Sequence, residues 1–229
     1  PPTPLRLSSA ASDVYKRQIL MIPFLEGIAL GASLIIAIGP QNAFVIQKGI
    51  LRQHVFLAAF VCTFVDVVLI IVGAAGFGTL IAIIPSLKTY FLWGGILFLM
   101  GYGTLSLISS FKDPGDEESL EENESGYSTK INRKSIIITA AGFSLLNPHV
   151  YLDTVILLGG LAAQYEIPER NYFAFGAIMA SVVWFYGIGY GATLVAPWFE
   201  SSRGKRILDL VIAMIMFVLA FVLMLNVLD

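Results

Sequence analysis

Charge and cysteine are scarce in this sequence. Of its 229 residues, 13% are charged and 57% are hydrophobic, whereas soluble domains average about 25% charged and 45–50% apolar residues. A water-soluble enzyme of this size could not bury so much apolar surface. The single cysteine, Cys62, excludes an internal disulfide and a cysteine-rich metal or thiol-redox centre.

The sequence also lacks the motifs that mark common enzymes and ATPases. It contains no GxSxG nucleophile elbow, no HExxH zinc motif and no P-loop. We therefore predict that the chain is not an enzyme, needs no cofactor or metal and binds no nucleic acid. ATP-driven transport by this chain alone is disfavoured for the same reason.

Six long apolar segments dominate the sequence. A helix needs roughly 20 apolar residues to cross a hydrocarbon core about 30 Å thick, and each segment is long enough. Helices satisfy their own backbone hydrogen bonds in lipid, and the alternation expected of barrel strands is absent. We predict an all-α integral membrane protein with six transmembrane helices at residues 22–46, 55–80, 87–111, 135–162, 172–199 and 207–228.

Two segments stand outside this apolar pattern. Residues 1–20 are mostly polar, are rich in proline and serine, and lack the apolar core of a signal peptide, so we predict a non-native or disordered leader. Residues 112–134 carry seven acidic side chains and are predicted to form a solvated cytoplasmic loop. Residues 21–229 then form a single transmembrane domain.

Basic residues predict how the helices are oriented, because positively charged connections stay on the cytoplasmic side. The second and fourth connections hold only Lys88 and Arg170. We therefore predict that the odd connections are cytoplasmic and that both termini lie outside. The odd connections hold nine basic residues, which are Lys48, Arg52, Lys112, Lys130, Arg133, Lys134, Arg203, Lys205 and Arg206.

The spans divide into two halves with related features. Three spans per half would place duplicated halves in opposite orientations, as in transporters built from inverted repeats. The first and fourth spans each contain a proline beside polar residues, Pro40 and Pro148. The second and fifth each contain a Gly-x-Gly pair, beginning at Gly76 and Gly189. We predict two inverted three-helix repeats.

The two prolines predict helix breaks. Proline removes a backbone donor and clashes with the preceding turn. Breaks at matched positions of two halves point to a transporter binding site, and a restarted helix presents free N–H groups that suit an anion. A packing kink is the alternative interpretation of either proline.

Acidic side chains lie inside the predicted spans. Asp66, Asp153 and Glu26 do so, whereas no lysine or arginine lies inside a span except Lys88, at the very start of the third. Carboxyl groups in a membrane are costly and usually functional, and acids without a basic partner suit a cation or a proton. Asp66 and Asp153 are predicted to bind substrate and to couple it to protons, the alternative being a hydrogen-bonded structural carboxyl. For His149, packing and a binding or relay role stay equally open.

Small residues are spaced for close helix contact. Gly27 and Gly31 form a GxxxG motif, as do Gly187 and Gly191, and such motifs let helix backbones approach each other. Contacts within one chain or between copies would both use these motifs, so a homo-oligomer is compatible with the sequence.

Four stretches carry a resemblance to a known family. Residues 27–32 read GIALGA, residues 39–45 GPQNAFV, residues 49–53 GILRQ and residues 146–154 LNPHVYLDT. These stretches resemble the LysE/ArgO family of basic amino-acid exporters, and Asp66 falls where that family carries an aspartate in its second span. The resemblance covers residues 24–228.

The resemblance implies a multi-pass bacterial plasma (inner) membrane exporter of L-arginine and/or L-lysine, driven by ion gradients. Together with the acids inside the spans and the paired breaks, it favours proton antiport as the mechanism. Exporters of neutral amino acids (homoserine or threonine) or of a cation, and a non-transporting membrane subunit, stay open as alternatives. With the acids and the breaks at Pro40 and Pro148, it gives candidate substrate-binding residues Gln41, Asn42, Asp66, Asn147, His149, Tyr151 and Asp153.

Overall fold

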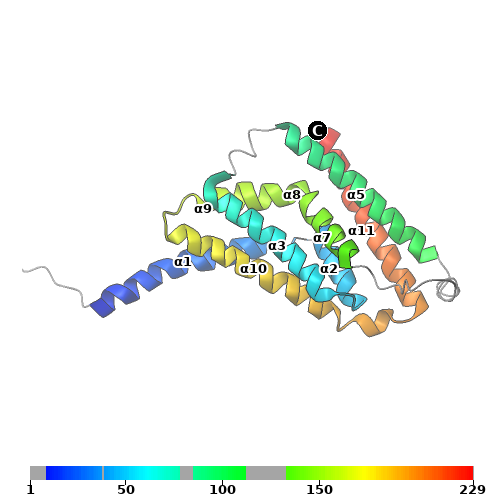
Figure 1. The fold of residues 1–229 in the computed structure, drawn as a ribbon, viewed down its shortest axis with the longest axis horizontal. Coiled ribbons are helices and arrows are strands. Elements are labelled where there is room, and N and C mark those ends of the chain that lie inside the picture. Colours follow the sequence, from blue (N-terminus) through cyan, green and yellow to red (C-terminus); the bar gives the residue numbers. More distant parts are fainter. Residues whose placement is uncertain (1–8, 38, 78–84, 112–132, 229) are drawn as a thin grey trace, which may run out of the picture.

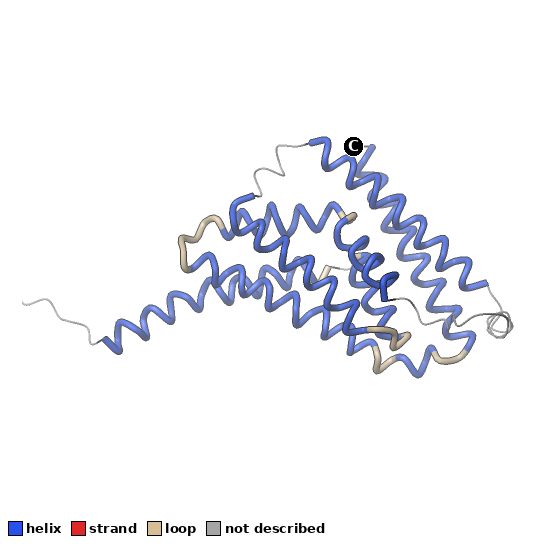
Figure 2. Tube along the Cα trace, in the orientation of Figure 1, coloured by secondary structure: helices blue, strands red, loops and turns tan. Residues whose placement is uncertain are grey.

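The protein is helical throughout the part that the structure describes. The structure is a computed structural model, and it describes residues 9–37, 39–77, 85–111 and 133–228 (Figures 1 and 2). The predicted leader lies partly, and the acidic connection 112–134 almost wholly, outside these residues. The elements are α1 (Ser9–Ile35), α2 (Pro40–Ile50), α3 (Val55–Val72), η1 (Gly73–Phe77), α5 (Pro85–Phe111), α7 (Arg133–Leu145), α8 (Pro148–Val150), η2 (Tyr151–Leu158), α9 (Gly159–Ala162), α10 (Glu169–Ala192), η3 (Ala196–Phe199) and α11 (Ser202–Leu228).

Four to six of these helical units could span a membrane. Four straight helical stretches, within α3–η1, α5, α10 and α11, are long and apolar enough alone. Two bent pairs, α1 with α2 and α7 with α8–α9, raise the number to six when each pair counts as one span. The prediction of an all-helical membrane protein is confirmed at this level, whereas the inverted repeat and the outward termini stay predictions.

Several helix boundaries differ from the predicted spans, most of all the start of α1 and the end of α10. α1 begins at Ser9, inside the segment predicted to be a leader. The fifth predicted span is wrong at its end, because α10 stops at Ala192 and a separate 3-10 turn follows at η3. Pro197 explains the early stop, since its ring clashes with the carbonyl four residues earlier and removes a helical donor.

The two Gly-x-Gly pairs begin in different local structures. Gly76 lies inside the π-helical turn η1 and has a φ of +94°, a conformation that favours glycine. Gly189 instead lies inside the continuous helix α10, where an added Cβ would come within 3.1 Å of Val55 on α3. One glycine therefore breaks a helix and the other allows two helices to approach.

Close helix contacts explain the first GxxxG motif. α1 runs along α10 and α5 runs along α11 (Figure 1). A Cβ on Gly27 would overlap the Phe173 carbonyl of α10, and one on Gly31 would lie 2.9 Å from the Cα of Ala177. This motif therefore packs within the chain. A Cβ on Gly187 or on Gly191 would meet nothing within 4 Å.

The largest core cluster positions the short helix α2 at the centre of the bundle. Phe44 and Val45 of α2 are buried with Cys62 of α3, Phe143 of α7 and Met216 of α11. Large apolar side chains cover the outside of α3, α5, α10 and α11, as a lipid-facing surface requires. α2 is consequently held by helices from both halves of the sequence.

Candidate functional site

The two bent helices meet at their breaks. The chain turns by 82° between α1 and α2 and by 61° between α7 and α8. Pro40 and Pro148 are the first residues after the two bends, preceded by Gly39 and Asn147 in extended conformations. A Cβ on Gly39 would lie 4.0 Å from the Asn147 side-chain nitrogen, so the breaks are adjacent in space.

The first break is stabilised by the Asn42 side chain. Its amide nitrogen donates to the carbonyl oxygens of Ile35 (2.9 Å) and Ala37 (2.8 Å), which the bend leaves without helical donors. Its amide oxygen accepts from the indole nitrogen of Trp184 on α10 at 3.2 Å. Both N–H donors of the Asn42 amide are satisfied within the protein. Asn42 therefore contributes to the site by stabilising the break.

Two other predicted site residues, Asn147 and Tyr151, stabilise the second break. The side-chain oxygen of Asn147 accepts from the backbone N–H of His149 at 3.2 Å and caps the restarted helix. The Tyr151 hydroxyl donates to the carbonyl of Leu145, the last residue of α7, at 2.8 Å. Tyr151 does not line the pocket described below; its hydroxyl satisfies the helix end beside it.

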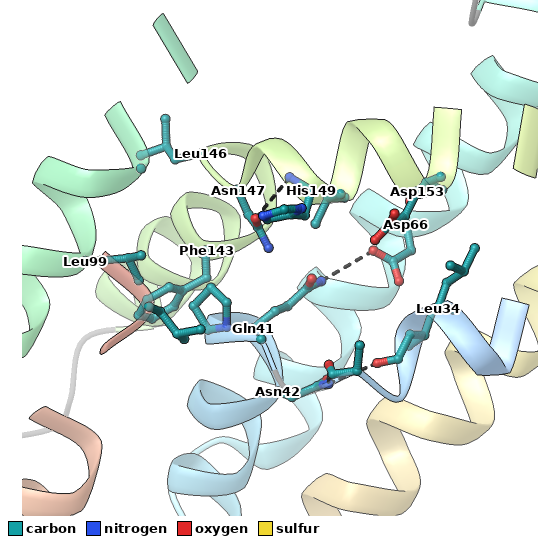
Figure 3. Close-up of a pocket in the computed structure, with 18 of the residues that line it drawn as sticks. Leu34, Gln41, Asn42, Asp66, Leu99, Phe143, Leu146, Asn147, His149 and Asp153 are labelled. Carbon is teal, nitrogen blue, oxygen red and sulfur yellow. Dashed lines mark hydrogen bonds between the residues drawn. The ribbon is translucent and has the colours of Figure 1, made fainter. Parts of the chain in front are cut away.

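Asp66 is buried at the centre of the molecule. It lies on α3, with 4% of its surface exposed. One carboxylate oxygen accepts from the Ser181 hydroxyl of α10 at 2.9 Å. The other is 3.4 Å from the side-chain nitrogen of Gln41 on α2, the contact drawn in Figure 3. Both donors are neutral, so the hydrogen bonds do not supply the positive charge that a buried carboxylate needs.

Asp153 lies on the other broken helix and faces the same pocket. It belongs to η2, a π-helical stretch that follows α8, and such distortions occur often at functional sites. Its carboxyl group is drawn on the same side of the pocket as Asp66, with His149 nearer the break (Figure 3). Glu26 does not line this pocket; its carboxylate accepts a hydrogen bond from Tyr165.

These side chains surround a pocket of about 300 Å³, within the size range of small-molecule sites. Its wall includes no lysine or arginine among the described residues, and those residues contain no group of three possible metal ligands. Apolar side chains from α1, α5, α7, α10 and α11 contribute to the rest of the wall. The polar lining residues are Gln41, Asn42, Asp66, Asn147, His149, Asp153 and Thr154, and the larger apolar ones include Leu34, Phe98, Leu99, Phe143, Leu146, Phe185, Leu219 and Leu223.

Ser181 was not among the predicted site residues, although the sequence held a signal for it. Ala177, Ser181 and Phe185 follow one another at intervals of four, so they share one face of a helix. All three side chains on this face of α10 are almost completely buried. A serine in a buried apolar stripe needs a hydrogen-bond acceptor, and here the acceptor is Asp66.

Comparison with known proteins identifies the family. The model of the LysE type translocator family matches residues 32–227, most of the chain. The chain belongs to the LysE type translocator family. This LysE-type translocator is therefore a multi-pass membrane transporter and not an enzyme.

Relatives cover nearly the whole translocator. A putative amino-acid transporter, YggA, from Aeromonas salmonicida is 41% identical over 86% of this chain and 92% of its own. A Yersinia enterocolitica protein named arginine exporter protein ArgO is 37% identical over 88% and 96% of the two chains. A Klebsiella pneumoniae protein of the same name is 38% identical over 86% and 91%. No solved structure gives a significant match.

Proposed function

We propose that this translocator exports cationic L-amino acids, arginine and/or lysine, from the cytoplasm in exchange for protons. The observation that carries the proposal is the pocket itself. It joins two helix breaks, contains the carboxyl groups of Asp66 and Asp153, and has no lysine or arginine in its described wall. Relatives at 37–38% identity that are named arginine exporters support the same substrate class.

The pocket offers complementary groups to the two ends of such a substrate. The guanidinium or ammonium group pairs with Asp66 or Asp153, because a buried carboxylate without a resident cation gains most from a visiting one. The α-carboxylate meets backbone N–H groups where α2 and the helical run Pro148–Ala162 begin, near Gln41 and Asn147. The aliphatic stem lies against the apolar wall.

Exchange with a proton follows from the cost of moving charge. Carrying one positive charge outward against an inside-negative potential of 100 mV costs about 2.3 kcal/mol. A proton that replaces the substrate on Asp66 or Asp153 and returns inward cancels that charge movement. The pH gradient and the substrate gradient then drive export together.

Alternating access completes the proposal. Rocking of two three-helix halves about the adjacent breaks exposes the pocket to one side of a bacterial inner membrane and then to the other. The odd connections, rich in lysine and arginine, lie in the cytoplasm under this proposal.

The test is uptake into inverted membrane vesicles with an imposed pH gradient. Vesicles that contain the wild-type chain are compared with vesicles that lack it, using labelled arginine, lysine and threonine in parallel. Concentrative uptake of arginine or lysine that collapses with the pH gradient supports the proposal. Uptake of threonine alone, or no uptake, overturns it.

A further inference from the structure

Lys48 is a buried cation that the proposed transport mechanism does not use. The sequence places it in the first connection, but the structure places it on α2 with 9% of its surface exposed. A buried charge is stable only with compensating partners. Its ammonium nitrogen lies 5.4 Å from the ring centroid of Phe44, within the range of a cation–π contact, and the charge of Asp209 on α11 acts on it.

The groups around Lys48 connect three helices. The Tyr102 hydroxyl of α5 donates to the Gln47 side-chain oxygen of α2 at 2.6 Å. The Ser109 hydroxyl of α5 donates to Asp209 of α11 at 3.1 Å. We name Gln47, Lys48 and Asp209 the Lys48 cluster.

An aromatic layer separates this cluster from the pocket. Phe98 and Phe143 line the pocket, and their ring centroids are 4.9 Å apart. Phe143 packs on Phe44 (5.3 Å) and on Tyr102 (4.9 Å), the two rings nearest the cluster. Phe44 and Phe143 are almost completely buried. The aromatic layer, defined as Phe44, Phe98, Tyr102 and Phe143, lies between the pocket and Lys48.

Distances along two helices give the depth of the cluster. Leu99 lines the pocket on α5 and Ser109 contacts Asp209, ten residues further along, which is about 15 Å. On α11, Leu219 lines the pocket ten residues after Asp209, again about 15 Å. The cluster therefore lies towards the end of the bundle where α5 ends and α11 begins (Figure 1), which is the cytoplasmic end in the proposed orientation.

We propose that the Lys48 cluster and the aromatic layer form a cytoplasmic gate, closed in this structure, in which the Lys48 ammonium occupies a cation-binding position that an incoming substrate takes over. The inference rests on the proposed function, since an exported amino acid must pass this end to reach the pocket. The position combines the face of an aromatic ring with a carboxylate. Those are the groups that bind a guanidinium or an ammonium ion.

The exchange of cations makes the gate selective. A cationic side chain competes with Lys48 for Asp209, and the released Lys48 then leaves the Phe44 ring as the gate opens. A neutral amino acid has no group that replaces the ammonium, so it leaves the gate closed. Asp209 is thus a specificity-determining residue that the substrate meets before it reaches Asp66.

Cysteine labelling tests the gate without requiring transport. The single natural cysteine is replaced by Cys62→Ser, and Leu146→Cys places a reporter in the pocket wall. Inverted vesicles then expose the cytoplasmic face to a membrane-impermeant thiol reagent. Lys48→Ala should raise the labelling rate about tenfold or more. A tenfold increase corresponds to destabilising the closed state relative to the open one by about 1.4 kcal/mol.

The matched control is Arg52→Ala. Arg52 is a basic residue at the same end of the bundle, but its side chain is 56% exposed and makes a surface ion pair with Glu200. Its replacement should leave labelling unchanged. Equal labelling rates for Lys48→Ala and Arg52→Ala overturn the gate. Asp209→Asn, which keeps the lysine and removes the carboxylate charge from the cluster, should also raise labelling and serves if Lys48→Ala does not assemble.

A kinetic measurement tests the cation-binding position itself. With Cys62 and Leu146 retained, Lys48→Ala should lower the ratio of kcat/KM for arginine to that for threonine, because the gate no longer requires a cation to open. An unchanged ratio overturns the selective role. Absence of arginine transport in the wild-type chain would contradict the proposed function, while the labelling rates still report whether the gate exists.

Discussion

The hydrogen bond between Ser181 and Asp66 gives the most quantitative prediction about the site. Both side chains are buried, and the hydroxyl donates to the carboxylate at 2.9 Å. The bond stabilises the carboxylate whether it is free or paired with a substrate cation, but not when it is protonated. Ser181→Ala should therefore favour the proton over the substrate at Asp66.

The size of the effect follows from the type of bond. A hydrogen bond to a charged group contributes about 1.5–3 kcal/mol, which corresponds to roughly 10- to 150-fold in an equilibrium constant. We expect the KM for arginine in Ser181→Ala to rise by that factor where protons compete. The deficit should shrink as the pH on the cytoplasmic side rises, because the carboxyl group is then ionised in both proteins.

The assay is initial arginine uptake into inverted vesicles, measured across a range of pH. Ser110→Ala is the matched control, because Ser110 is also a buried serine but donates to Leu107 in its own helix at 2.6 Å. The reasoning is refuted if Ser181→Ala raises KM no more than this control. It is also refuted if the deficit grows with increasing pH.

Three further predictions concern the site and its scaffold. Asp66→Asn should abolish proton-coupled arginine uptake in vesicles while the chain still assembles, because an amide neither titrates nor pairs with a cation. Asn42→Ala should destabilise the folded protein by about 1–3 kcal/mol for each carbonyl left without a donor, measured as a lower denaturation midpoint in detergent. Gly27→Leu should lower the same midpoint, since even a Cβ there overlaps the Phe173 carbonyl.

The controls differ for each variant. Proton-driven arginine uptake by Asp66→Asn at the wild-type rate would contradict its assignment. A wild-type midpoint for Asn42→Ala would show that other donors, such as water, satisfy the two carbonyls. Gly187→Leu is the control for Gly27→Leu, because a Cβ at Gly187 meets nothing within 4 Å, and equal losses in the two variants would contradict the packing argument.

The sequence predicts the helical class because composition decides it. Long apolar segments with few charges can satisfy their backbone groups in lipid only as helices or closed barrels, and the described residues form the helices. The bends beside Pro40 and Pro148 follow from the missing backbone donor. The 82° and 61° angles, and the contact between the two breaks, depend on tertiary packing that no local pattern records.

The burial of Lys48 and the hydrogen-bond partners of Asp66 could not be predicted from the sequence, because both depend on tertiary packing. Lys48 falls in a connection in the sequence prediction, yet α2 is short and the break turns it into the bundle, where its ammonium group lies over the Phe44 ring. The partners of Asp66 come from α2 and α10, 25 and 115 residues away in sequence. Spacing along one helix carries no information about such distant pairs.

Proton movement in reconstituted liposomes tests the central claim most directly, namely that Asp66 and Asp153 alternate between a substrate cation and a proton. The membrane potential is clamped, an arginine gradient is imposed, and pH inside the liposomes is followed with a trapped dye. The account predicts that arginine flowing in one direction drives protons in the other, and that Asp66→Asn abolishes this movement. Arginine flux through the wild-type chain without any proton movement would contradict it.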